Sequence, residues 1–213
     1  LAAILVRDPD AAINVADATS VADANLLVAA TTGIVTAGVT ATAAQLAGLS
    51  ADAQANAITA TVSTGDVLAS DLTIIDGRTS IAVDAQLAEK ISGTAAEVKS
   101  VIDAENADPQ SINIDGDYAS DVSGTTVSVS DADDIVQATD GQVQFTGSIT
   151  DSAAAMASEA AAGGNPAGTI TAAFGRVTDG SGTDKGDGDV VVTVNTAANV
   201  AQAATIAAAT TGQ

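Results

Sequence analysis

The feature that most constrains the fold of this chain is an eight-residue pattern that recurs along it. In ISGTAAEV (91–98) a strand-like start is followed by a small polar residue, two alanines, one variable residue and a large aliphatic residue. Related stretches are VTATAAQL (39–46), VSDADDIV (129–136), ITDSAAAM (149–156) and VNTAANVA (194–201), with a looser copy, VADANLLV, at 21–28. Each stretch predicts a strand end, a helix N-cap and a first helical turn. Repetition of such a unit indicates a stacked array.

The expected helix starts predict the length of one repeat. They fall near residues 20, 42, 64, 94, 131, 151 and 196, and the first intervals are about 22 residues long, enough for a strand, a helix and two turns. The sequence therefore predicts an α/β fold, a βα solenoid-like array with a parallel sheet, short helices and right-handed connections. An irregular α+β domain or a β-rich sandwich is the alternative. We expect the first half of the coils in 1–110 and the second half, with loop inserts, in 111–213, or one continuous domain.

Three local predictions can be checked one by one. Large aliphatic residues spaced i, i+3 and i+4 predict a helix over 95–106. The β-branched run at 72–75 predicts a strand. Leu26 and Leu27 are expected to face inward from a helix that ends near Ala30.

Small aliphatic side chains supply most of the apolar surface. Hydrophobic residues make up 46% of the chain but aromatic residues only 1%, namely Tyr118, Phe145 and Phe174. A globular core normally uses large rings to fill irregular space. A core without them suits thin layers that pack closely and repeatedly, which favours the array.

The charge of the chain restricts its partners. There are 27 acidic and 6 basic residues, for a net charge of −21. Nucleic acids and anionic membranes bind clustered lysine and arginine, so we expect neither as a partner. No apolar run is long enough to insert into a membrane. Salt or divalent cations relieve the self-repulsion, so we expect an extracellular or cell-surface location, with a low-salt cytosol as the alternative. The start, LAAILVRDPD, lacks a signal sequence, and we expect a fragment or processed product.

Residues suited to catalysis are scarce. The chain has no His and no Cys, the side chains that most often act as base and nucleophile. It also lacks the phosphate-binding and hydrolase motifs that depend on glycine-rich turns. We therefore expect that the protein is not an enzyme.

Calcium is the one cofactor that the sequence suggests. Calcium binds six to eight oxygen ligands held in flexible loops. The longest loop is rich in glycine and carries the predicted ligands Asp179, Asp184, Asp187 and Asp189. A second, weaker group consists of Asp115, Asp117 and Asp121. A hydrated loop without an ion is the alternative at both places.

Two stretches resemble a known class of proteins. In VADANLLVAATTGIVTAGVT (21–40), the residues from Asn25 to Gly33 lead into a β-branched run, and ISGTAAEVKSVI (91–102) is similar to repeats that begin ISGTAADV. On these residues the chain resembles giant Ala/Thr/Asp-rich repeat proteins, surface or secreted, of marine cyanobacteria and related Gram-negative bacteria. The resemblance implies roles in adhesion, surface coats or motility, often with haemolysin-type calcium repeats. The chain departs from that pattern in lacking regular tandem copies.

The expected function is structural. A solenoid-like array needs polar end segments to stay monomeric, yet both ends, LAAILV and AATIAAATTG, are apolar. This predicts self-association, as a homo-oligomer or filament, in an extracellular bacterial surface fibre, coat or adhesin. The alternative is a calcium-dependent module that binds carbohydrate or a cell surface, with a surface glycan as its partner.

Overall fold

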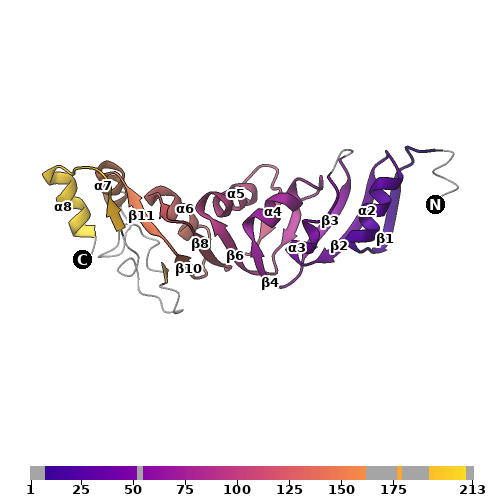
Figure 1. Ribbon diagram of the computed structural model, residues 1–213, viewed down its shortest axis with the longest axis horizontal. Coiled ribbons are helices and arrows are strands. Elements are labelled where there is room, and N and C mark those ends of the chain that lie inside the picture. The colour runs from indigo at the N-terminus through magenta and orange to yellow at the C-terminus, as the bar shows by residue number, and fades with distance from the viewer. Residues whose placement is uncertain (1–7, 52–54, 162–176, 179–191, 210–213) are drawn as a thin grey trace. The chain divides into compact units, whose positions relative to one another are not determined.

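The computed structural model describes residues 8–51, 55–161, 177–178 and 192–209 (Figure 1). Over these residues the protein has an α/β fold with seven helices and three sheets, and its strand pairs are parallel. The strands are β1 (Ile13–Ala18), β2 (Val35–Ala41), β3 (Ala57–Val62), β4 (Gly65–Leu68), β5 (Val83–Ala85), β6 (Ala88–Thr94), β7 (Ile112–Ile114), β8 (Ala119–Ser123), β9 (Thr126–Val127), β10 (Val143–Phe145), β11 (Ser148–Asp151), β12 (Val177–Thr178) and β13 (Val192–Val194). The helices are α2 (Val21–Ala30), α3 (Ala43–Leu46), α4 (Ala69–Asp76), α5 (Ala95–Glu105), α6 (Val129–Gln137), α7 (Ala153–Ala161) and α8 (Val200–Ala209).

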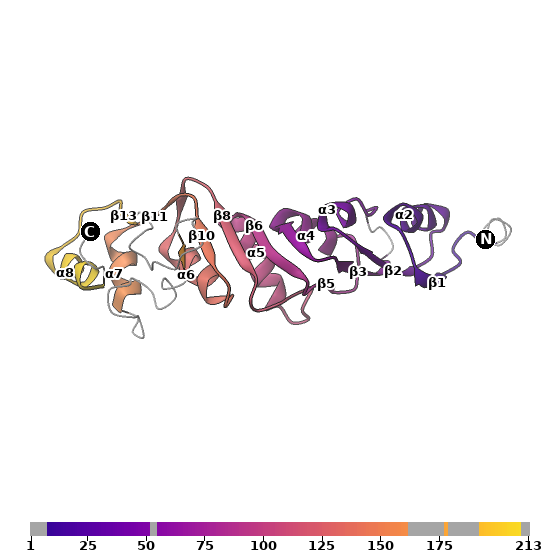
Figure 2. The same ribbon diagram turned by 90° about the horizontal axis from the view of Figure 1, so that it is seen from below.

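The chain divides into two compact units, and the first comprises residues 1–90 and 100–115. Its main sheet has the order β1-β2-β3-β5-β7, which follows the order of the chain. Ile13 pairs with Val35, and Thr36 pairs with Ala57, so each strand lies beside the strand of the next βα segment. Helices α2 and α3 pack against β2, and Figure 2 shows them beside the strands that they connect. A βα segment here means one or more strands and the helix that follows them.

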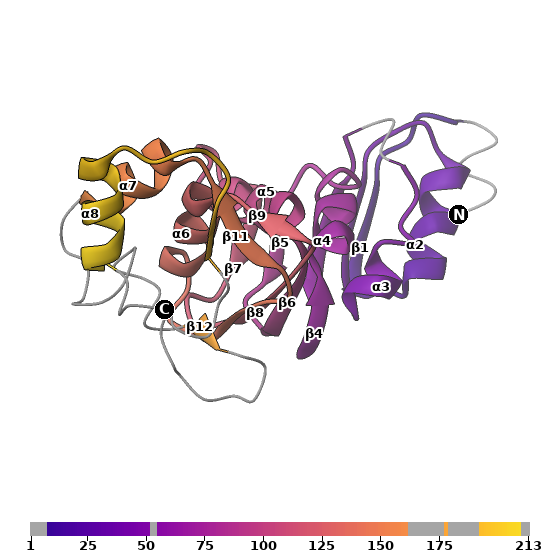
Figure 3. The same cartoon turned by 60° about the vertical axis from the view of Figure 1, so that its left-hand side comes forward.

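The second compact unit comprises residues 91–99 and 116–213. Within it, β8, β10 and β12 form one run of parallel strands, and β9, β11 and β13 form another. Helix α6 packs against β11, and α7 lies between α6 and α8 (Figure 3). In the described part of the sheet β9-β11-β13, β13 and β9 are the edge strands, and α8 is the last described helix.

The core is built from alternating small aliphatic side chains. In β2, Val35, Ala37 and Val39 are 0%, 3% and 1% exposed, while the residues between them face away from this layer. Burying a valine side chain stabilises the fold by about 1.5–3 kcal/mol relative to leaving it in water. Alanines near the helix starts are also buried, among them Ala43, Ala69, Ala132 and Ala153. A methyl side chain at this position lets helix and sheet approach closely.

Small polar residues cap most of the described helices, although not always at the predicted position, and α4 is an exception because Leu68 at its N-cap makes no side-chain cap bond. Thr42 forms a capping box with Gln45 at the start of α3. At α5 the Thr94 hydroxyl and N–H both donate to the Glu97 carboxylate, at 2.9 and 2.8 Å. Ser128 caps α6, three residues before the helix start expected near residue 131, because its hydroxyl accepts the Asp131 N–H at 3.0 Å. Such caps contribute about 0.5–2 kcal/mol each.

A threonine after a helix clamps three of the βα segments. Its hydroxyl donates to carbonyl oxygens 20 to 23 residues earlier in the chain and accepts the N–H two residues later. We call this arrangement the threonine clamp. Its members are Thr31 with Ala11 and Gly33, Thr79 with Ile58 and Ile81, and Thr139 with Tyr118 and Gly141.

Two of the local predictions were wrong. The run 72–75 is not a strand but part of α4, because Leu72 and Ile75 lie on one helix face and are both fully buried. Leu26 does not face inward: it is 67% exposed, while Ala24 is the buried residue of α2. The helix predicted over 95–106 is confirmed as α5.

Candidate functional site

The predicted calcium ligands fall largely outside the described structure. Asp179, Asp184, Asp187 and Asp189 all lie outside the described residues. The weaker group of Asp115, Asp117 and Asp121 lies within them. In the described part of the chain no three acidic side chains come close enough together to hold a metal ion, and these three aspartates do not form such a cluster.

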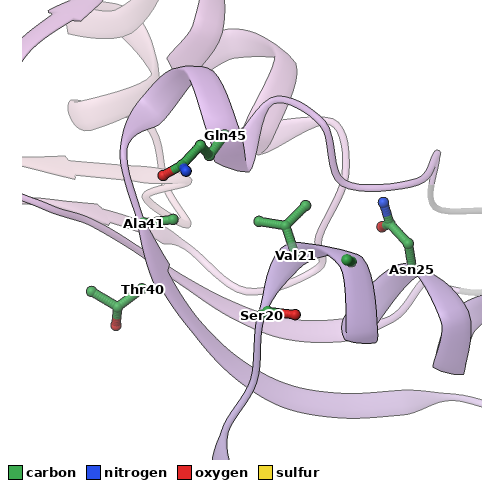
Figure 4. A pocket seen from close by; sticks show the side chains of 7 residues that line it. Ser20, Val21, Asn25, Thr40, Ala41 and Gln45 are labelled. Carbon is green, nitrogen blue, oxygen red and sulfur yellow. The ribbon is translucent and has the colours of Figure 1, made fainter.

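A shallow pocket of about 590 Å³ lies between α2, the end of β2 and α3 (Figure 4). Its wall consists of Ser20, Val21, Ala22, Asn25, Thr40, Ala41 and Gln45. Ser20 and Gln45 serve as helix caps, through their bonds to Asp23 and Thr42. The Asn25 side chain donates to the Gly48 carbonyl at 2.8 Å and accepts the Ser50 N–H at 2.7 Å. The Ser20 and Gln45 bonds are thus local to the helix starts, whereas the two Asn25 bonds join α2 to the segment that follows α3.

Four carboxyl groups of the described residues have a shifted pKa, each for a local reason. Hydrogen bonds from the N–H and hydroxyl of Thr94 lower the pKa of Glu97, which is a helix cap. Partial burial raises the pKa of Asp76, against the opposing effect of its bond with Ser111. Asp8 and Asp10 share a hydrogen bond that raises the pKa of Asp8 and lowers that of Asp10.

Two ion pairs tie segments together within the compact units. Lys90 Nζ lies 3.0 Å from Asp66 in the first unit, and Lys99 Nζ lies 2.7 Å from Asp134 in the second. Both pairs are partly exposed, so each contributes about 0–1 kcal/mol. Their role is therefore structural.

The surface that does stand out is the last βα segment, β13 with α8. The sequence from Val190 to Gln213 contains no charged residue, although the chain carries a net charge of −21. No side chain from Val200 to Ala207 is buried, and Val200 is 88% exposed. An uncharged helix that is open to solvent along its length is unusual for a surface element. We call β13 and α8 the C-terminal face.

The first βα segment, β1 with α2, is also open. Of the residues in α2 only Ala24 is buried, and Leu26 is 67% exposed. In β1 the side chains of Ile13 and Val15 are half-buried, whereas Val35, the partner of Ile13 in β2, is 0% exposed. We call β1 and α2 the N-terminal face. The sequence indicated apolar ends, but exposure of Leu26 was visible only once the rotation of α2 was known.

Among the residues with described structure, no helix is both long and apolar enough to cross a bilayer. No family model, curated protein or solved structure matches this chain.

Proposed function

We propose that this chain is a structural, non-enzymatic module of an extracellular bacterial surface fibre, coat or adhesin, and that it associates with copies of itself. The observation that carries the proposal is the C-terminal face. This face carries no charge and has no buried side chain from Val200 to Ala207, although the chain as a whole has a net charge of −21. Arrays of stacked segments normally need a polar outer face at each end to remain separate.

The exposed apolar surface gives association its driving force. Each Å² of apolar surface removed from water contributes about 25 cal/mol. Val200 and Leu26 are 88% and 67% exposed, so each has most of its side chain still to bury. The high net charge opposes association over distances of about 10 Å or less in physiological salt, and salt weakens that repulsion. A salty or calcium-containing exterior therefore suits both the charge and the assembly.

The aromatic residues support this function over sugar binding. Protein sites for sugars commonly stack an exposed ring against the sugar face. Tyr118 and Phe145, the aromatic residues in the described part of the chain, are 1% and 8% exposed. Neither ring offers a stacking surface, so no observation favours the glycan-binding alternative.

Light scattering and electron microscopy of the full chain test the proposal. We expect the average mass to rise with protein concentration and with salt, and fibres or a lattice to form at high concentration. Val200→Glu places a charge on the C-terminal face at the start of α8, where a helix tolerates an acidic residue. Association should weaken at least tenfold in this variant. Thr59→Glu, which adds the same charge at an exposed position of β3, is the matched control. A monomeric wild-type chain at every concentration would refute self-association.

A further inference from the structure

The last described βα segment has the same layout as the first. Strand β1 begins at Ile13, α2 spans Val21–Ala30, and Thr-Thr-Gly follows at 31–33. Strand β13 begins at Val192, α8 spans Val200–Ala209, and Thr-Thr-Gly follows at 210–212. The two segments therefore match in strand-to-helix spacing, helix length and the tripeptide after the helix. In the first segment, this layout leads into β2, which pairs in parallel with β1.

Backbone hydrogen bonds show which groups lie on the free edges. The Ile13 N–H donates to the Ile34 carbonyl on the β2 side at 2.9 Å, so the next residue, Asn14, directs its N–H to the other edge. The Asn195 N–H donates to the Asp151 carbonyl at 2.8 Å, so Val194 directs its N–H away from β11. Among the described residues β1 pairs only with β2, and β13 only with β11. Within the described part of the chain, β1 and β13 therefore each have one edge without a strand partner.

We propose that copies of this chain associate head to tail, the free edge of β13 in one copy pairing in parallel with the free edge of β1 in the next. The inference rests on the proposed function and specifies its surfaces. In this contact, β1 of the second copy lies beside β13 of the first copy, just as β2 lies beside β1 within one copy. Leu26 and Val200, exposed on the two end helices, gain apolar cover in the same contact.

Electrostatics argues for a contact between unlike faces. The N-terminal face and the turn before it carry Asp8, Asp10, Asp17 and Asp23 with no basic residue between 8 and 30, whereas the C-terminal face is uncharged. Two N-terminal faces would bring these carboxylates together, which is unfavourable. An acidic face against an uncharged face avoids that repulsion.

Strand direction argues against pairing two C-terminal faces. A two-fold axis between them would place one β13 antiparallel to the other. Strand pairs in the described part of the chain are parallel, including β11 with β13. A head-to-tail contact keeps the parallel direction, and because it joins two different surfaces it can be repeated from copy to copy. Such heterologous contacts build open filaments or closed rings.

Two edge-blocked variants test the geometry. Asn14→Pro and Val194→Pro each remove one N–H from a free edge, where proline is tolerated, and leave the Ile13 and Asn195 bonds in place. We expect each variant alone to be monomeric by sedimentation velocity, with association weakened at least tenfold. Mixed in equal amounts, they should form a complex of two chains and no larger, because each retains the face that the other has lost. Circular dichroism melts confirm that each variant is folded.

A second pair of variants tests the same contact in case a proline variant does not fold. Leu26→Glu and Val200→Glu change side chains that are already exposed, and they should show the same pattern alone and mixed. If Asn14→Pro still dimerises and Val194→Pro does not, the contact joins two C-terminal faces and the inference is wrong. If all single variants associate like the wild type, the ends are not the interface, and the proposed function survives without this inference. A mixture that stays monomeric also overturns it, whereas a monomeric wild type overturns both proposals.

Discussion

Replacing Thr139 by valine should show how much one threonine clamp contributes to stability. Thr139 is 2% exposed, and its hydroxyl donates to the Tyr118 carbonyl and accepts the Gly141 N–H at 2.9 Å. Valine has nearly the same shape but can make neither bond. A net hydrogen bond contributes about 0.5–1.5 kcal/mol, and leaving a buried partner without its bond costs about 1–3 kcal/mol. The two lost bonds together predict a loss of about 2–4 kcal/mol.

Thermal and urea unfolding measure this loss. For a chain of this size each kcal/mol lowers Tm by about 2–4 °C, so Thr139→Val should melt roughly 5–15 °C lower, with an unchanged urea m-value. Thr139→Ser keeps the hydroxyl and loses only a methyl group, which costs about 1 kcal/mol. Thr59→Val changes an exposed threonine of β3 and should stay within about 0.5 kcal/mol of the wild type. The reasoning is refuted if Thr139→Val is as stable as Thr59→Val, or more stable than Thr139→Ser.

Three further changes test other parts of the fold and site. Gly33→Ala should cost about 3 kcal/mol by urea unfolding, because its Cβ would lie 2.2 Å from the Asp10 carbonyl oxygen, whereas Gly38→Ala, with nothing within 4 Å, should be nearly neutral. The Glu97 pKa is lowered in the folded state, so its bonds stabilise the protein above the ordinary value of 4.5 and are lost as the pH falls below it. The difference in urea midpoint between wild type and Glu97→Gln should shrink over that range, and a difference independent of pH would contradict the cap. If the predicted loop binds calcium, millimolar calcium should raise Tm relative to chelator by an amount that Asp184→Asn reduces, and equal Tm values would exclude the ion.

Local chemistry explains why parts of the fold were predictable from the sequence. Thr42 and Thr94 cap helices because a hydroxyl three residues before a Gln or Glu forms a capping box whatever the surroundings are. The inner face of α5 was predictable as well, because the large aliphatic residues in 95–105 are spaced so that they lie on one side of a helix. Parallel strands follow from the alternation of strand and helix along the chain.

Tertiary packing explains what the sequence did not reveal. The run 72–75 is β-branched in part and has the composition of a strand, but burial of Leu72 and Ile75 on one helix face outweighs that preference. Leu26 is a large apolar residue of the kind found in cores, yet Ala24 is the buried residue of α2, and Leu26 is part of the N-terminal face. Which apolar residue of α2 points inward depends on the rotation of the helix. The apolar residues are spread around α2 rather than gathered on one face, so the sequence does not determine that rotation.

The same physical features set both the stability and the proposed assembly. An inner segment is covered on both sides: β2 has β1 and β3 as neighbours, and its valines are buried. Among the described residues β1 and β13 have one strand neighbour each, so part of the burial and hydrogen bonding available to an inner strand is missing there. In a small-aliphatic core no single large side chain can compensate for that deficit, because each residue contributes only a small area. The N-terminal face offsets part of it with acidic groups that water solvates well. The C-terminal face has no such groups, and a further segment of matching direction is the contact that would restore what its edge lacks.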